Sequence, residues 1–203
     1  MRYLFLTCLL WLAIFPAFAE SRYTTSKNQA ITVSSRLDFE VSIPRILYLR
    51  VGTGSAFASN STISLIDFTV PANQMGSGIP LTANAGSGDL GNGVVTAMVM
   101  ANDGDVSLSS TTSGSLSSGT GSSIPYSEIL TTASALSSPL VLPAPDLVSA
   151  STTTISISAD SGQLVNRNAR WTYNYKNSQV VPAGIYGGSN INNGRVVYTV
   201  SMP

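Results

Sequence analysis

Residues 31–43 alternate between apolar and polar side chains with one interruption. The odd-numbered positions are apolar except at Ser35, and every even-numbered position between them is polar. Successive side chains of a β-strand point to opposite faces, so this pattern predicts a strand with one dry face and one solvated face. The apolar positions are Ile31, Val33, Leu37, Phe39, Val41 and Ile43.

A secretory signal peptide is predicted directly before this strand, over residues 1–19. Arg2 supplies a positive start, residues 4–15 form an apolar run, and Ala17 and Ala19 are small residues where a signal peptidase reads the chain. The run is short for a membrane span of about 20 residues. We therefore expect cleavage after Ala19 and an exported mature chain. A long amphipathic strand near the start of such a chain completes its own sheet or is donated to a neighbour's.

The mature chain predicted in this way has 184 residues and neither cysteine nor histidine, because the single cysteine is Cys8. Ser-His-Asp and Cys-His catalysis would lack their base, and zinc sites built from His and Cys are excluded. Loss of Arg2 leaves nine basic against ten acidic residues, and there is no basic cluster to bind nucleic acid. We expect one domain that buries a core without disulfides, with no enzymatic activity and no cofactor.

Nearly every patterned segment has period two, which predicts an all-β, immunoglobulin-like β-sandwich over residues 44–203. Pro44 has no N–H to donate and is the expected break, so residues 20–43 form an N-terminal extension. Residues 107–123 are expected to be a surface loop or a frayed hairpin, and 128–136 at most a turn or two of helix. The expected strands are 46–51, 62–70, 79–83, 94–101, 106–109, 139–142, 152–159, 169–176 and 195–202.

Two short motifs resemble ligand-binding signatures. Residues 86–91 match the glycine-rich dinucleotide fingerprint, but a β-branched run follows where that fingerprint needs a helix. We interpret them as a loop. Residues 103–105 read Asp-Gly-Asp, yet the glycine and glutamate of a calcium-binding loop are missing downstream. The Asp103-Gly104 pair between two β-branched runs predicts a hairpin turn.

Trp171, Tyr173 and Tyr175 alternate on one face of a predicted strand, opposite polar residues. Two alternatives are open. The rings pack in the core of the sandwich, where aromatic side chains contribute much of the buried area. Alternatively they form an exposed row that stacks on sugar rings, which would make the protein a self-contained secreted module that binds a host or surface glycan.

The two ends of the chain resemble subunits of chaperone–usher fimbriae, above all the class typified by colonisation-factor pilins. The similar segments are 27–28, 31–35 and 44–49 at one end, and 182–188, with a P-x-G-x-Y motif, and 196–202 at the other. The resemblance implies an immunoglobulin-type sandwich that lacks its last strand. The N-terminal extension of the next subunit fills the gap by donor-strand complementation, after a periplasmic chaperone has filled it temporarily. The cysteine pair of many such subunits is absent here.

We therefore expect a structural subunit of a surface fimbria, or pilus, active in cell adhesion. Its expected partners are other pilin subunits, a periplasmic chaperone and an outer-membrane usher. The expected route is export through the periplasm to the cell surface. Subunit assembly is assigned to the apolar face of 31–43, and the groove-edge residues are Val196, Tyr198, Val200 and Met202.

Overall fold

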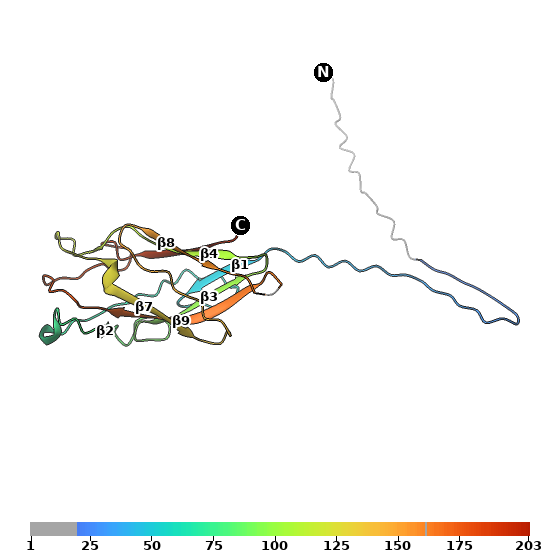
Figure 1. Cartoon of the computed structure of the whole chain (residues 1–203), viewed down its shortest axis with the longest axis horizontal. Helices are drawn as coiled ribbons and strands as arrows, with labels where there is room; N and C mark the ends of the chain where they lie inside the picture. Colours follow the sequence, from blue (N-terminus) through green and yellow to red (C-terminus); the bar gives the residue numbers. More distant parts are fainter. Residues whose placement is uncertain (1–19, 161) are drawn as a thin grey trace, which may run out of the picture. The chain divides into compact units, whose positions relative to one another are not determined.

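The computed structural model describes residues 20–160 and 162–203, so the expected signal peptide lies outside the described residues. The chain divides into an N-terminal unit that ends at Ile43 and a domain, Pro44–Pro203. Nearly all regular structure is β, with 32% strand and 3% helix, and the sheets are antiparallel. The domain is consistent with a β-sandwich, and Figure 1 shows its strands in two layers.

The larger sheet has five strands and is organised around β9 (Val165–Tyr175). β3 (Val94–Ala101) pairs with the first part of β9, and β1 (Leu47–Val51) pairs with the far edge of β3. β7 (Ile129–Ala135) pairs with residues 169–175 of β9. Because β3 and β7 overlap along residues 169–172, they lie on opposite edges of β9. The two-residue β2 (Leu81–Thr82) extends the β3 side.

The smaller sheet has three strands, with β4 (Val106–Thr112) between β8 (Thr152–Ile157) and β10 (Val196–Ser201). The remaining elements are short. They are the strands β5 (Leu116–Ser117) and β6 (Ser123–Ile124), which pair with each other, and the 3-10 helices η1 (Ala72–Gln74) and η2 (Tyr126–Glu128).

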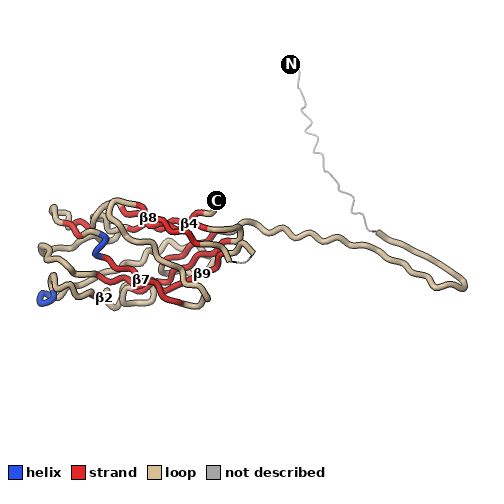
Figure 2. The backbone as a smooth tube through the Cα atoms, viewed as in Figure 1, coloured by secondary structure: helices blue, strands red, loops and turns tan. Residues whose placement is uncertain are grey.

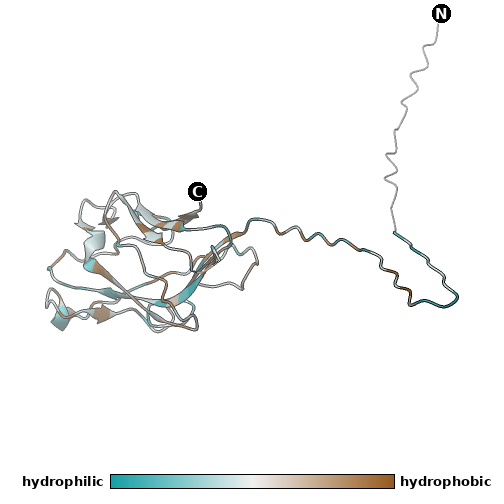
Figure 3. Cartoon of the chain, turned by 45° about the vertical axis from the view of Figure 1, so that its right-hand side comes forward, coloured by the Kyte–Doolittle hydropathy of each residue, from teal (hydrophilic) through white to brown (hydrophobic). Residues whose placement is uncertain are grey.

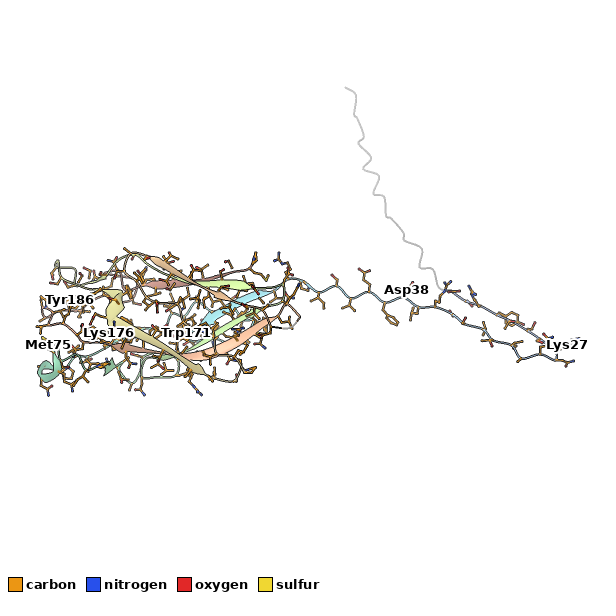
Figure 4. All side chains as sticks on the ribbon, viewed as in Figure 1. Lys27, Asp38, Met75, Trp171, Lys176 and Tyr186 are labelled. Carbon is orange, nitrogen blue, oxygen red and sulfur yellow. The ribbon has the colours of Figure 1, made fainter. Side chains whose placement is uncertain are left out.

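The core lies between the two sheets, because each contributes one dry face. Val95, Val99 and Trp171 point inward from the larger sheet, and Leu108 and Ile157 point inward from the smaller one. Trp171 is fully buried inside the domain (Figure 4). Its indole N–H donates to the carbonyl oxygen of Leu142 at 2.9 Å, which satisfies the one polar atom of the ring.

The Asp103-Gly104 turn does not form the expected hairpin. β3 belongs to the larger sheet and β4 to the smaller one, so this turn carries the chain from one sheet to the other. Asn102 precedes the turn and holds the start of the domain: its amide group donates to the Pro44 carbonyl at 2.8 Å and accepts from the Ile46 N–H at 2.7 Å. Arg45 pairs with Asp103 at 2.5 Å and donates to the Pro203 carbonyl at 2.6 Å.

The expected strands are confirmed best where an alternating apolar pattern is bounded by turn residues close to it in the sequence. The bounds of β3 agree with the prediction, and β1, β8, β9 and β10 differ from it by a few residues. Three expectations about these elements were wrong. Residues 62–70 contain no assigned strand, and residues 129–135 form β7 rather than a helical turn. The expected strand at 139–142 is reduced to an isolated bridge between Val141 and Asn168. Residues 107–123, expected to be a surface loop or a frayed hairpin, continue β4 to Thr112, and β5 then pairs with β6 as a short hairpin.

Residues 20–43 contain no assigned strand, and a bend at residues 27–29 divides them into two arms (Figure 2). Glu20 forms ion pairs with Arg22 at 2.5 Å and with Arg36 at 2.7 Å. Its carbonyl oxygen also accepts a hydrogen bond from the Ser35 hydroxyl at 2.6 Å. Apolar residues recur along the second arm (Figure 3), and side chains project from both sides of its backbone around Asp38 (Figure 4).

Candidate functional site

β10 is an edge strand. All six of its residues pair with β4, from Val196 opposite Thr112 to Ser201 opposite Ser107. Among the described residues, no strand pairs with its second edge. A sheet edge of this kind presents a row of backbone N–H and C=O groups to any strand that approaches it.

An apolar groove lies beside β10 within the domain, with a cavity volume of about 990 Å³. Its walls come from β1, from residues 62–70, from residues 181–190 and from the start of β10. Apolar side chains dominate the lining, so the groove matches another apolar surface better than a charged ligand. Representative lining residues are Leu49, Val51, Phe68, Ile129, Val196 and Tyr198.

Three tyrosines extend the groove toward the core: Tyr126 and Tyr173 are buried, and Tyr198 is half-buried. The Tyr173 and Tyr198 hydroxyls lie 2.9 Å apart, and the Tyr198 ring lies against Trp171 with centroids 5.3 Å apart. Burial raises the pKa of Tyr198 to about 12 and that of Tyr173 well above its usual value. The Tyr126 hydroxyl donates to the Asn193 carbonyl at 2.8 Å, and burial raises its pKa to about 12. These phenols are therefore neutral near pH 7, and the groove floor carries no charge from them.

Asn177 fixes one rim of the groove. It is 1% exposed and follows β9, and its side chain holds the loop around η1. The amide group donates to the Gln74 carbonyl at 2.5 Å and to the Ser77 hydroxyl at 3.2 Å, and it accepts from the Gly76 N–H at 3.0 Å. Asn177 itself has φ of 54°, a conformation that asparagine tolerates better than most residues.

The four predicted groove-edge residues all belong to β10 or directly follow it. Val196 and Tyr198 line the groove, while Val200 and Met202 pack against the core cluster without lining the groove. Sequence reasoning missed the opposite wall. Ile66 and Phe68 pack on the core from a segment that was expected to be a strand, and their spacing of two is the signal that was available.

The predicted assembly residues are all exposed. The exposed fraction of these side chains ranges from 51% at Ile31 to 87% at Phe39. Large apolar side chains that are exposed close together are unusual on a monomeric protein, and such patches are typical of interaction surfaces. The full set is Ile31, Val33, Leu37, Phe39, Val41 and Ile43.

The aromatic row on β9 is not available to an external ligand as an exposed platform. Trp171, Tyr173 and Tyr175 are 0%, 6% and 5% exposed. This is the core-packing arrangement, and it contradicts the exposed row that the glycan alternative requires. The physical reason is that these rings occupy the inward positions of the central strand of the larger sheet, where they bury the most area.

The two signature-like motifs have structural partners. Residues 86–91 form a loop that leads into β3, and a side chain at Gly88 would lie 2.3 Å from the Val94 carbonyl. Asp89 accepts from the Thr96 N–H at 2.8 Å and pairs with Arg50 at 3.3 Å.

The Asp-Gly-Asp motif also has a structural role, because Asp105 accepts from the Ala159 N–H at 2.7 Å. In the described part of the chain, no three His, Cys, Asp or Glu side chains are grouped to hold a metal ion.

Within the same described residues, no helix has the length and hydropathy that crossing a lipid bilayer requires. Comparisons of the chain with protein-family models, with curated proteins and with solved structures gave no match in any of the three.

Proposed function

We propose that this protein is a structural subunit of a surface fimbria, in which residues 31–43 of one subunit occupy the groove beside β10 of the next. One observation carries the proposal: the same chain has a sheet edge with which none of its described strands pairs, beside an apolar groove, and a separate segment whose apolar residues are exposed.

The chemistry of the two surfaces is complementary. The free edge of β10 offers backbone donors and acceptors to an added strand, as in other cases of strand addition to a sheet edge. Every second residue of the added strand would enter the groove, which has apolar walls and uncharged phenols at its floor. Arg36, Asp38 and Glu40 lie on the other face and would stay in water. β10 has six residues, so the rest of the donated strand would run beside residues 181–190.

Burial of this apolar face would make the assembly long-lived. Removing apolar surface from water contributes about 25 cal/mol per Å². Six buried side chains would contribute on the order of 10 kcal/mol before the cost of ordering the strand. Backbone pairing with β10 adds to this. Such subunits would stay associated in detergent and separate only on heating.

The other partners follow from the resemblance of the two chain ends to chaperone–usher pilins. A periplasmic chaperone would cover the groove until a neighbouring subunit arrives, and an outer-membrane usher would export the growing fibre to the cell surface. Both roles are proposed from this likeness and from the need to cover the apolar groove before assembly.

Gel electrophoresis in SDS of surface-extracted protein, with and without boiling, tests the proposal. We expect a ladder of subunit multiples that collapses to one band on boiling. Phe39→Asp should abolish the ladder while a chaperone-held subunit stays soluble, and Asp38→Ser on the polar face should leave the ladder intact. A folded protein that runs as a monomer in both lanes would instead indicate a self-contained domain. Unfolding of a monomer by Phe39→Asp would place 31–43 in its own sheet.

A further inference from the structure

A second hollow of the domain lies beside β1 and the loop that follows it. Its volume is about 580 Å³, within the range of small-molecule sites. Residues 46–51 form one side and the loop residues between Thr53 and Thr62 form the other. Among the described strands, β1 pairs only with β3. The other edge of β1 is therefore flanked by this loop and not by a strand.

Two aromatic rings meet at this hollow. The Tyr48 and Phe57 ring centroids are 5.2 Å apart, and their planes are tilted by 37°. The Tyr48 hydroxyl donates to the Ser55 carbonyl at 2.9 Å, which fixes the phenol to the loop. Phe57 is 60% exposed, so a large apolar face is presented to solvent at the mouth of the hollow.

The backbone holds Phe57 in a conformation that disfavours a bulky residue. The Ala58 N–H donates to the Ser55 carbonyl at 3.3 Å and closes a turn, and Phe57, at its third position, has φ of 58°. Glycine or asparagine normally occupies a turn position with positive φ. A strained residue that displays an exposed ring is a reason to look for a function of that ring.

The lining away from the rings divides into an apolar side, formed by Ile46, Leu47, Leu49 and Val51 of the β1 segment, and a mainly polar side formed by the loop. Hydroxyl and amide side chains surround the rings, and Asn60 is held in place by donating to the Thr53 carbonyl at 3.2 Å and accepting from the Thr62 N–H at 2.7 Å. Arg50 is the one charged residue that lines the hollow, and its charge is paired with Asp89 at 3.3 Å. The polar lining residues of the loop are Thr53, Ser55, Ser59, Asn60 and Thr62.

We infer that this hollow binds an uncharged saccharide. The apolar C–H face of a pyranose ring would stack on Phe57, and its hydroxyl groups would exchange hydrogen bonds with the polar loop residues. An acidic sugar would find no unpaired cation in the lining, since Arg50 is already paired. This site is distinct from the buried aromatic row of β9. The inference goes beyond the proposed function, because strand donation needs no ligand at β1.

The full mature chain should be tested on an array of immobilised oligosaccharides that end in galactose, mannose, N-acetylglucosamine or sialic acid. We expect binding to at least one neutral glycan. Phe57→Gly removes the ring and relieves the positive φ, so it should keep the fold while weakening binding by at least about tenfold. Phe57→Tyr should retain binding. Leu164→Ala, at an exposed apolar residue outside this hollow, is the control for nonspecific adhesion.

Three results would overturn the inference: no binding to any neutral glycan, equal binding by Phe57→Gly, or binding to sialylated glycans alone. Thermal unfolding of each variant establishes that the fold is kept. Saturation-transfer NMR on the unmutated chain is independent of the variants. With the methyl glycoside of the best neutral sugar as the probe, irradiation of aromatic protons should transfer saturation to the sugar C–H protons, and absence of transfer would contradict stacking. If the protein showed no fimbrial ladder but still bound a neutral glycan through Phe57, the proposed fimbrial function would be wrong and the saccharide site would still be supported.

Discussion

The hydroxyl groups of Tyr173 and Tyr198 lie 2.9 Å apart and join the central strand of the larger sheet to the edge strand of the smaller one. Both side chains belong to the core or pack against it. Of the strands in residues 20–160 and 162–203, only β4 pairs with β10, so this bond and the packing on Trp171 hold the face of β10 to the rest of the domain. The tyrosine pair is therefore a support of the groove as well as a part of the core.

Removal of one member of this pair should cost more than removal of both. Tyr198→Phe leaves the buried Tyr173 hydroxyl without its partner, and a buried unsatisfied polar group costs about 1 to 3 kcal/mol. The double variant, with Tyr173→Phe added, should recover part of that loss. Urea unfolding of the wild type, both single variants and the double variant measures the coupling. Additive losses would mean that the two hydroxyls do not interact.

Stability should fall at alkaline pH. Burial raises the pKa of Tyr126 and Tyr198 to about 12, above the value of 10.0 that an exposed tyrosine has. The folded state therefore holds protons that the unfolded state has released, and the stabilisation is present below pH 10 and lost between about pH 10 and 12. Urea midpoints at about pH 8 and about pH 11 should differ in that direction. Tyr198→Phe should reduce the difference.

A peptide of residues 31–43 should stabilise a chain that cannot donate its own strand. The Phe39→Asp chain keeps the groove but has a charged residue on the apolar face of its extension. At a free concentration of 100 times its Kd, a ligand of the folded state adds about 2.7 kcal/mol, and the thermal midpoint should rise accordingly. A peptide with the same Phe39→Asp change is the matched control. A rise with both peptides, or with neither, would contradict occupation of the groove by the apolar face.

Asn177 should prove important both for its hydrogen bonds and for its backbone conformation. Asn177→Gly keeps the positive φ but loses the contacts to the loop around η1, which should cost about 1 to 3 kcal/mol. Asn177→Ala loses the same contacts and adds backbone strain, so it should be less stable than the glycine variant. Denaturant unfolding ranks the two. Equal stabilities would mean that the strain is absent.

Trp171 should be a stability residue and not a ligand contact. Trp171→Ala removes a fully buried ring and the hydrogen bond to the Leu142 carbonyl, and a loss of about 3 to 5 kcal/mol is expected. Chemical unfolding measures the loss. Trp171→Phe should lose less because most of the packing remains. A stable, folded Trp171→Ala protein with altered glycan binding would overturn this assignment.

The sequence predicted the fold where information is local. The run from Val94 to Ala101 has β-branched residues and a clear turn on each side, and it folds as β3 with the expected bounds. Residues 129–135 lack a clear period, and they become β7 because seven residues of β9 pair with them. Such pairing depends on a strand about forty residues away and leaves no local trace.

The candidate site shows the same limit. The edge strand at 196–201 could be read from alternation alone, whereas the apolar strand face of 31–43 stays a prediction. The residues that face β10 across the groove could not be predicted. Leu49 and Phe68 are far from β10 in the sequence, and only the folded chain brings them to the same groove. Asp103-Gly104 has the composition of a hairpin turn, but composition does not say whether the next strand stays in the same sheet.

The contacts of Arg45 and Asn102 at the start of the domain determine which strands would bear a mechanical force applied to the N-terminal extension. The Asn102 side chain forms hydrogen bonds with the Pro44 carbonyl and the Ile46 N–H, on either side of Arg45. Arg45 in turn forms an ion pair with Asp103 and donates to the Pro203 carbonyl. These contacts join the start of β1 to the residues that follow β3 and β10. Tension applied through residue 43 would therefore act on all three strand ends and not on β1 alone. A pull on the chain would in this way load contacts to strands of both sheets together with β1.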